Sequence, residues 1–258
     1  MTDPIADWTP SRNGGADGYP GLRLLVGGEW RTAATATPVL NPATEEVLGY
    51  VPHATEADID DALAASERGF RTWRRMTPAD RGAVIHTAAR LLRERRDYLA
   101  AVITREMGKP LREAQVEIDT ATGILDWNAE EGRRTYGRLI PGPEQRQQLV
   151  VQEPIGPVAA FAPWNAPLIT PSRKISSALA AGCSVVIKPA EETPATALCL
   201  AEAFLEAGLP PGVLGVLFGN PAQISGRLLT SPVIRALTFT GSTGVGKSLA
   251  SLAAAHMV

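Results

Sequence analysis

The chain has 258 residues, of which 45% are hydrophobic and 20% are charged, a composition typical of a soluble globular protein with one or two domains. Its 25 basic and 27 acidic residues give a net charge of −2, which suggests neither nucleic acid nor an anionic membrane as the main partner. Two cysteines and three scattered histidines suit neither a disulfide framework nor a metal site, and no apolar run approaches the about 20 residues of a membrane span. We therefore expect a cytoplasmic protein without a bound metal.

The chain begins with residues 1–20, which are rich in Pro, Gly, Asp and Ser and predict a mobile tail. A short strand and hairpin are expected over 24–30, because Gly27 and Gly28 provide a tight turn. A helical block follows. Its helices are expected after Thr55 as N-cap with Asp58 at the third helical position, after Thr77 with Pro78 in the first turn, over 97–107 and over 111–132.

Eight arginines crowd this helical block between residues 71 and 96, and such a cluster could be a nucleic-acid surface. Acidic side chains are interleaved with them at pairing distances. A phosphate-binding surface needs an excess of positive charge, so we interpret the block as a solvated, ion-paired face.

Beyond the helical block the pattern changes twice. Residues 138–155, with Pro141, Gly142 and Pro143 in a turn, predict two extended arms of a protruding β-hairpin. From Gly156 onward, short apolar runs alternate with helical stretches, which predicts a parallel sheet with right-handed crossovers and a ligand at the carboxyl ends of its strands. The strands are expected at 158–161, 184–187, 213–217 and 236–239, and the helices near Leu168, Ala195, Ala222 and Val245.

Residues 241–248 satisfy the P-loop pattern G-x-x-x-x-G-K-[ST] between a predicted strand and a predicted helix. A P-loop enzyme also needs later strands that supply a Mg²⁺-holding Asp, and only ten residues follow Ser248. We therefore interpret Gly241 and Ser242 as part of a diphosphate-binding turn at a helix N-terminus. A P-loop NTPase and an ordinary glycine-rich turn remain the alternatives.

Two further loops follow predicted strands. Asn165 lies in a proline-flanked loop, where its side-chain amide could donate to a developing oxyanion or could simply form a turn. Lys188 and Glu191 lie after the next strand, where they could hydrogen-bond ribose hydroxyls or decorate a solvated loop.

Together, these loops resemble the aldehyde dehydrogenase superfamily in their order and spacing. The segments that carry the resemblance are 162–165, 188–191 and 239–243, with 41–44, 104–111, 153–158 and 178–183 in support. It covers nearly everything from about Leu22 to the last residue, and residues 104–111 and 241–247 are most similar to semialdehyde dehydrogenases. The resemblance implies an α/β fold with a Rossmann-like parallel sheet, flanking helices, an N-terminal helical block and a protruding hairpin.

The resemblance also implies a chemistry in which a Cys thiolate adds to an aldehyde, hydride passes to NAD, and Glu-activated water releases the acid. By position, Asn165 would hold the aldehyde oxygen, and Lys174 would take part in a proton relay, a surface helix lysine being the alternative. A carboxylate at Glu191 would repel a 2′-phosphate, so NAD is expected over NADP. The implied cofactor-binding residues are Ala162, Pro163, Trp164, Lys188, Pro189, Ala190, Glu191, Gly241 and Ser242.

The sequence departs from the family in what it lacks. Neither a Glu-Leu-Gly-Gly segment nor a later nucleophilic Cys is present, and Cys183 and Cys199 are interpreted as packing residues. Residues 247–258 form a helical pattern without a stop signal, so we expect the chain to end inside an element. The expected organisation is a discontinuous, truncated NAD-binding domain over 21–137 and 156–258, with the catalytic domain absent and a homo-oligomerisation hairpin over 138–155. Such a chain would be inactive alone, and a non-catalytic truncated NAD-binding or assembly protein stays open.

Overall fold

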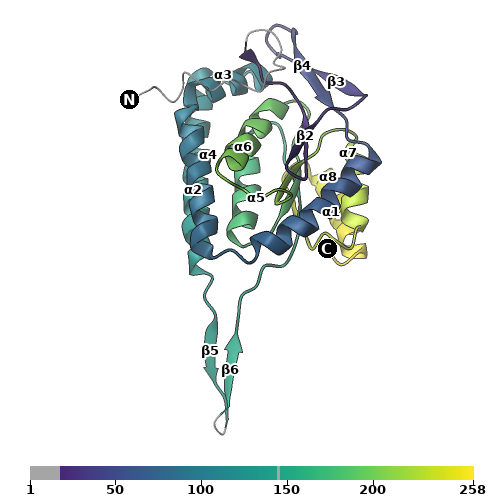
Figure 1. Ribbon diagram of the computed structural model, residues 1–258. Helices are drawn as coiled ribbons and strands as arrows, with labels where there is room; N and C mark the ends of the chain where they lie inside the picture. The colour runs from purple at the N-terminus through teal and green to yellow at the C-terminus, as the bar shows by residue number, and fades with distance from the viewer. Residues whose placement is uncertain (1–17, 144–145) are drawn as a thin grey trace.

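The structure, a computed structural model, describes residues 18–143 and 146–258. Within these residues a mixed sheet forms the centre, with strand order β10-β7-β8-β9-β1-β2 (Figure 1). Its strands are β1 (Leu24–Val26), β2 (Glu29–Arg31), β7 (Val158–Phe161), β8 (Val185–Lys188), β9 (Leu214–Val216) and β10 (Ala236–Phe239). Strands β7 to β10 pair in parallel, as the sequence predicted, and the predicted hairpin β1–β2 joins β9 as an antiparallel edge.

Strand β7 lies in the middle of the parallel part, and its neighbours fix its register. Val158 is opposite Val185 of β8 and Ala236 of β10. All residues of β7 and β8 are buried. Strands covered on both faces are continuously apolar rather than alternating, which is why these short runs could be recognised in the sequence.

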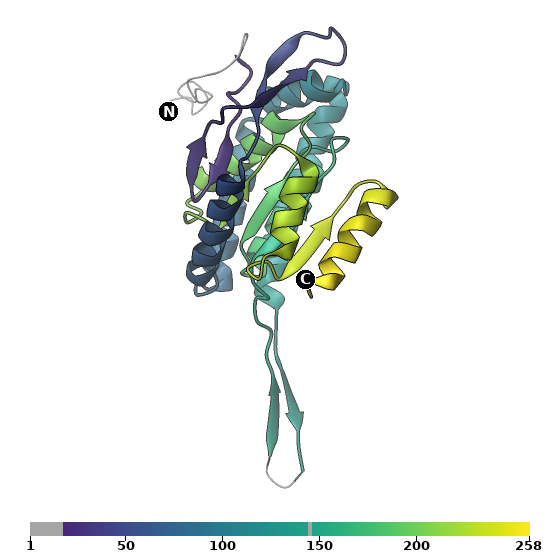
Figure 2. The same cartoon turned by 90° about the vertical axis from the view of Figure 1, so that its right-hand side faces the viewer.

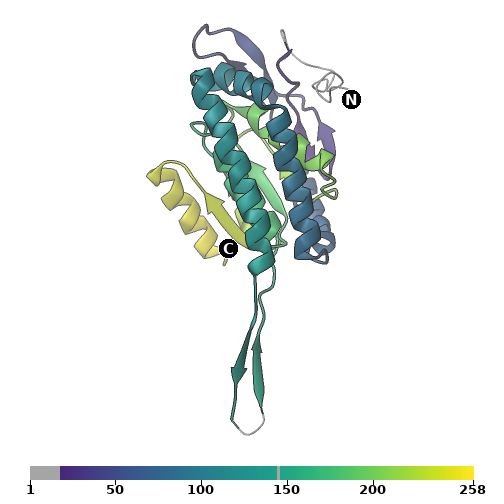
Figure 3. The same ribbon diagram turned by 90° about the vertical axis from the view of Figure 1, so that its left-hand side faces the viewer.

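Helices cover both faces of the sheet. One face carries α5 (Ile169–Ala180) and α6 (Pro194–Glu206), and the other carries α1 (Glu56–Trp73), α7 (Pro221–Thr230) and α8 (Thr243–Ala255) (Figure 2). An outer layer of α2 (Pro78–Glu94), α3 (Arg96–Met107) and α4 (Leu111–Glu131) packs on α5 and α6 (Figure 3). The α/β fold class and the N-terminal helical block are therefore confirmed.

The helix boundaries follow local signals. Thr55 caps α1 in a capping box, in which the Asp58 N–H donates to Thr55 Oγ1 at 3.2 Å and the Thr55 N–H donates to Asp58 Oδ2 at 3.0 Å. Gly108 ends α3 in the left-handed region at φ 75°, which suits a residue without a side chain. Helix α8 ends at Ala255 with His256 as C-cap, three residues before the last residue, where the sequence had predicted an unstopped helix.

Two N-terminal features differ from the expectations. The side chain of Tyr19 is fully buried and donates to Glu106 Oε1 at 2.7 Å, so the tail predicted over 1–20 is wrong at Tyr19, while residues 1–17 lie outside the described residues. A second hairpin, β3 (Ala36–Leu40) and β4 (Val47–Pro52), was not predicted. Its turn is built by Asn41, whose Oδ1 accepts the Ala43 N–H at 3.0 Å.

The arginine-rich block is ion-paired, as predicted. Its pairs join neighbouring helices or successive turns: Arg71–Glu67, Arg90–Glu94, Arg93–Asp126, Arg95–Glu206 and Arg96–Asp119. Arg81 differs from these residues because it is buried, and it donates to the backbone oxygens of Met76 at 2.7 Å and Ala180 at 3.3 Å.

The predicted hairpin is formed by β5 (Arg138–Pro141) and β6 (Gln147–Val150), which follow α4 and the short 3₁₀ turn η2 (Gly132–Arg134). The hairpin stands away from the body in all three views (Figures 1–3). Its apolar side chains are exposed, with Leu139 at 59% and Leu149 at 75% of their full accessible area.

Candidate functional site

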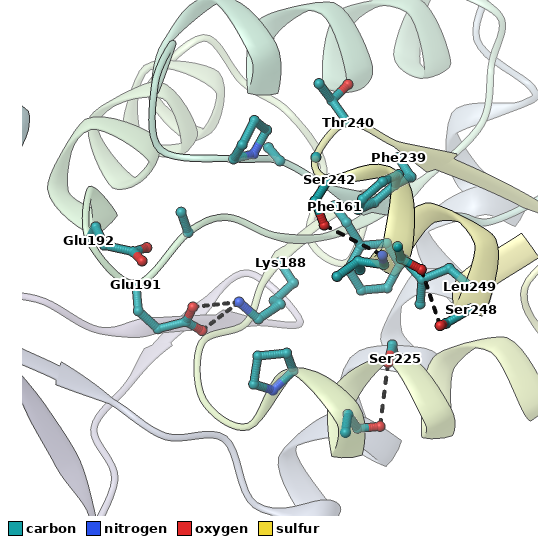
Figure 4. Close-up of a pocket in the computed structure, with 18 residues that line it drawn as sticks. Phe161, Lys188, Glu191, Glu192, Ser225, Phe239, Thr240, Ser242, Ser248 and Leu249 are labelled. Carbon is teal, nitrogen blue, oxygen red and sulfur yellow. Dashed lines mark hydrogen bonds and ion pairs between the residues drawn. The ribbon is translucent and has the colours of Figure 1, made fainter.

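A cleft of about 700 Å³ opens at the carboxyl ends of β7, β8 and β10 (Figure 4). The chain passes from β7 to β8 and β9 in one direction and then returns to place β10 on the other side of β7. Loops that leave β7 and β10 therefore diverge over opposite faces, and this is where ligands bind in open parallel sheets. Of the residues expected to contact a cofactor, the cleft is lined by Ala162, Pro163, Lys188, Ala190, Glu191, Gly241 and Ser242.

The loop from β10 to α8 forms one wall of this cleft. Ser242 is the N-cap of α8, and its hydroxyl oxygen accepts the Val245 N–H at 3.4 Å. A Cβ on Gly241 would lie 2.5 Å from the Phe239 ring, so this turn admits only glycine without rearrangement. The exposed first turn of α8 leaves backbone N–H groups and the positive end of the helix dipole facing the cleft, which favours an anionic group there.

The opposite wall holds an ion pair between Lys188 and Glu191. The Lys188 Nζ lies 2.6 Å from the Glu191 carboxylate and donates to the Pro189 carbonyl at 3.1 Å. The Gly219 N–H donates to Glu191 Oε1 at 3.2 Å, which ties this carboxylate to the loop after β9. Glu191 is thus oriented in the cleft, where its oxygens can accept hydrogen bonds from hydroxyl groups of a ligand (Figure 4).

The first turn of α7 also lines the cleft, and the sequence analysis did not identify it as part of the site. Pro221, Ala222 and Ser225 contribute this part of the wall. Asn220 caps the helix, its Oδ1 accepting the N–H groups of Ala222 at 3.0 Å and of Gln223 at 3.1 Å. The sequence did contain a signal for this part of the site, the Asn-Pro pair that starts a helix after a predicted parallel strand. Such a helix start must lie at the same edge of the sheet as the other loops.

Two expected cofactor residues lie outside this cleft. Trp164 is half-exposed and lines a neighbouring cavity, which Glu191 and Glu192 also border. Pro189 contributes its carbonyl to Lys188 and is not among the residues that line the cleft. Glu191 and Glu192 therefore line both cavities.

The two expected catalytic residues lie on or just before α5. Asn165 is exposed in the loop that follows β7, and its backbone oxygen accepts a hydrogen bond from Lys109 Nζ at 3.4 Å. Lys174 is buried, with only 7% of its area exposed, so the alternative of a surface helix lysine is wrong. Its Nζ donates to Thr238 Oγ1 of β10 at 3.2 Å, and burial lowers its pKa to about 8.

Neither cysteine suits a nucleophile. Cys183 and Cys199 are free and buried, and burial raises the pKa of the Cys199 thiol well above its usual value. In the described part of the chain, no three His, Cys, Asp or Glu side chains converge in a way that could hold a metal ion. The described helices include none with the length and apolar character that a bilayer crossing requires.

Comparison with known proteins places these features in a family. A profile of the aldehyde dehydrogenase family matches residues 30–258. The chain is 44% identical over 238 residues to 4-(hydroxymethyl)benzenesulfonate dehydrogenase TsaD1 of Comamonas testosteroni, a match that covers 91% of this chain and 50% of that protein. It is 43% identical to the succinate semialdehyde dehydrogenase of Acinetobacter baylyi, over 88% of this chain and 48% of that protein.

Solved structures agree. A crystal structure described as an E. coli NADP-dependent enzyme superposes with a TM-score of 0.90 at 40% identity, over 92% of this chain and 50% of that one. Betaine aldehyde dehydrogenase of Staphylococcus aureus, solved in complex with NAD⁺, superposes with a TM-score of 0.88 at 31% identity, over 92% of this chain and 48% of that one. The chain spans about half the length of the relatives it matches. On the family match and the shared fold, this chain belongs to the aldehyde dehydrogenase family.

Proposed function

We propose that this chain supplies the cofactor-binding half of an NAD-linked aldehyde dehydrogenase that oxidises an aldehyde, of the semialdehyde class, to a carboxylic acid. The observation that carries the proposal is that one cleft holds both a helix N-terminus, which suits a diphosphate, and a carboxylate, which suits ribose hydroxyls. The helix start at Ser242 faces one side for the diphosphate, and the Glu191 carboxylate faces the other for the ribose hydroxyls. The names of the relatives support the semialdehyde class.

The same geometry favours NAD. A carboxylate held by Lys188 and by the Gly219 N–H accepts ribose hydroxyls and repels a 2′-phosphate. The Lys188 ammonium partly offsets the negative charge of Glu191. The preference for NAD over NADP therefore rests on the orientation of the Glu191 carboxylate toward the cleft. The similar proteins include one described as NADP-dependent and one solved with NAD⁺, so both cofactors occur among proteins that share this fold.

Bound NAD would supply the hydride acceptor, and this chain would supply groups that position the substrate and move a proton. The Asn165 side-chain amide would donate to the aldehyde oxygen as negative charge develops there. Lys174, with its pKa near 8, could carry a proton on or off at neutral to slightly alkaline pH. The nucleophilic thiolate would come from outside these 258 residues, because both cysteines are buried. The general base would also come from outside them, because the sequence has no Glu-Leu-Gly-Gly segment.

Titration calorimetry of the purified, mass-verified chain tests the proposal. NAD is expected to bind more tightly than NADP, and Glu191→Gln is expected to narrow that difference at least about threefold by removing the repulsive charge. Measurable acid formation from an aldehyde by this chain alone would contradict its assignment as the half without nucleophile and base. Binding of Mg²⁺-ATP that NAD does not displace, and that Lys247→Ala abolishes, would instead support the P-loop NTPase.

We also propose that the chain forms a homo-oligomer through residues 138–155. The exposed side chains of Leu139 and Leu149 on a protruding two-stranded hairpin support this, since an isolated hairpin gains little stability alone and can add to a neighbouring sheet. Sedimentation velocity of a chain with 138–152 replaced by a short Gly-Ser link is expected to show a smaller species. An unchanged oligomer would refute this role.

Both cysteines are free thiols, which supports the cytoplasmic location proposed from the sequence.

A further inference from the structure

The loop that carries Asn165 is attached to the outer helical layer by a buried carboxylate. Glu117 of α4 has a side chain only 2% exposed. Its Oε1 accepts the N–H of Leu168 at 2.9 Å and the N–H of Ile169 at 3.2 Å. These N–H groups belong to the start of α5, where Leu168 is the N-cap position and offers no capping side chain. Glu117, which lies 51 positions before Leu168, thus accepts hydrogen bonds from the helix start, where a Ser or Asp at the N-cap position normally does so.

Lys109 completes this attachment. Its ammonium forms an ion pair with Oε2 of Glu117, while the other carboxylate oxygen remains on the helix start. The same Nζ lies 3.4 Å from the backbone oxygen of Asn165, within hydrogen-bond distance. The loop is therefore held at two points, at the carbonyl of Asn165 and at the first N–H groups of α5.

An ion pair with a buried carboxylate is a costly way to hold two elements together, because the Glu117 charge leaves water and Lys109 keeps only 16% of its side-chain exposure. Such a pair can serve to hold two segments in one geometry, because a carboxylate whose hydrogen-bond partners are all in place permits only one arrangement of those segments. Here the fixed element is the segment that carries Asn165, while the walls of the cofactor cleft are formed by other residues. Neither Lys109 nor Glu117 lines that cleft.

We propose that Lys109 and Glu117 are positioning residues that set where the Asn165 side-chain amide points. The proposal rests on the proposed function only for the role of Asn165 in aldehyde oxidation. The contacts of Lys109 and Glu117 with the Asn165 loop do not depend on that function. Loss of the pair would free the loop without changing cofactor affinity. The pair would then orient the Asn165 side chain toward the aldehyde without contacting the cofactor.

The experiment uses the isotope-labelled 258-residue chain and three variants, Glu117→Gln, Glu117→Ala and Lys109→Met. Asp119→Asn is the matched control, because Asp119 lies one half-turn along the same helix and joins α4 to Arg96 of α3 without contacting the Asn165 loop. The measurements are amide hydrogen exchange at Leu168 and Ile169, the NMR resonance of the Asn165 side-chain amide, and NAD affinity by calorimetry.

Glu117→Ala is expected to accelerate exchange at Leu168 and Ile169 by about tenfold or more, because both N–H groups lose their acceptor. Glu117→Gln should restore most of the protection, since its carbonyl oxygen can still accept, yet it should shift the Asn165 resonance because the pair with Lys109 is gone. Lys109→Met should shift that resonance with smaller changes in exchange. Asp119→Asn should leave both readouts unchanged.

The proposal is overturned if the Asn165 resonance stays unmoved in both Lys109→Met and Glu117→Gln, or moves equally in the control. If Glu117→Ala fails to fold, the two milder variants still decide the question. NAD affinity is expected to stay within about twofold in every folded variant, and a larger loss would show that the pair supports the whole cleft instead. Absence of NAD binding by the unmodified chain would refute the proposed function, while the exchange and resonance data would still test the attachment.

Discussion

The helices on the two faces of the sheet begin in different ways. On one face, α5 and α6 have no capping side chain of their own, and buried glutamates from the outer layer accept their first N–H groups. Glu117 serves α5, and Glu106 serves α6 by accepting the Ala195 N–H at 2.7 Å and the Thr196 N–H at 3.1 Å. On the other face, α7 and α8 are capped locally by their own Asn220 and Ser242.

This difference separates scaffold from ligand site. A buried carboxylate at a helix start satisfies its donors and cancels the positive end of the dipole, so α5 and α6 have little left to offer an anion. A neutral local cap leaves most of that potential intact, and the first turns of α7 and α8 both line the cleft. The face of the sheet that meets the helical block is thus neutralised, while the face that meets the cleft stays receptive to phosphate groups.

The strongest test of the comparison removes Glu106. Its carboxylate also accepts from Tyr19 and from the Thr196 hydroxyl at 2.5 Å, so it joins the N-terminal segment, α3 and α6 at one buried point. Glu106→Ala is expected to lower the free energy of unfolding by about 3 kcal/mol, because two backbone donors lose their partner inside the protein. Urea unfolding followed by circular dichroism at pH 7.5 measures this.

The exposed Glu113 of α4 provides the control, and Glu113→Ala should change stability by less than about 0.5 kcal/mol. The pH dependence adds a second check. Burial raises the pKa of Glu106 to about 7, so the folded chain binds more protons than the unfolded chain between roughly pH 4.5 and 7, and stability falls as pH rises through that window. The Glu106→Ala variant should lose this slope, and retention of the slope would contradict the assignment to Glu106.

Features whose partners are near in sequence could be predicted, and features whose partners are distant could not. The capping box of Thr55 and the glycine turn at Gly241 involve neighbours within three residues, so their residue types alone identify them. The caps of α5 and α6 are supplied from 51 and 89 positions away, and nothing in the spacing of Glu117 or Glu106 reveals their targets. For the same reason, the sequence indicated most of the cleft but not what holds the Asn165 loop.

Lys174 tests whether the scaffold face tolerates an isolated charge. It lies on α5, and its ammonium meets the Thr238 hydroxyl. Because burial lowers its pKa to about 8, the unfolded chain binds more protons between pH 8 and about 10.4, so stability should rise with pH in that window. Relative to Lys174→Met, the rise should be on the order of 2 kcal/mol. Chemical unfolding at pH 7.5 and 9.5 measures it.

The exposed Lys247 of α8 is the matched control for this measurement, and Lys247→Met should keep the full pH slope. A wild-type slope equal to that of Lys174→Met would show that Lys174 is solvated in solution.

Ser242→Ala tests the cleft side directly. Loss of the hydroxyl that accepts the Val245 N–H should cost about 1 kcal/mol of stability, well below the effect of removing Glu106. NAD affinity should fall about three- to tenfold, because the first turn of α8 loses its order where the diphosphate is proposed to bind. Asn220→Ala makes the equivalent change in α7. Equal stability losses for Ser242→Ala and Glu106→Ala would break the distinction between the two faces.

The smallest effect is expected at the surface of the outer layer, which carries the buried glutamates. His86 of α2 bridges to α4, with Nδ1 2.7 Å from Asp126 and Nε2 2.9 Å from Glu130. Burial alone would lower its pKa, but the hydrogen bonds to these carboxylates outweigh burial and raise it, as the charges of both carboxylates also do. Arg93 pairs with Asp126, and Arg133 and Arg134 act on Glu130, which moderates the attraction.

A raised histidine pKa stabilises the folded chain below pH 6.5 and loses that contribution as pH rises through the folded-state value. His86→Gln should therefore lower the thermal midpoint more at pH 5.5 than at pH 8.5, and the pair is exposed enough that the difference corresponds to well under about 1 kcal/mol. His53→Gln, in the strand-to-helix connection before α1, is the control for the loss of an imidazole. If the outer layer only buries carboxylates and needs no surface bridge, the two variants will show the same pH dependence. If the bridge between α2 and α4 keeps the glutamate-bearing helix in place, only His86→Gln will also speed amide exchange at Leu168, which would extend the attachment of the Asn165 loop to the protein surface.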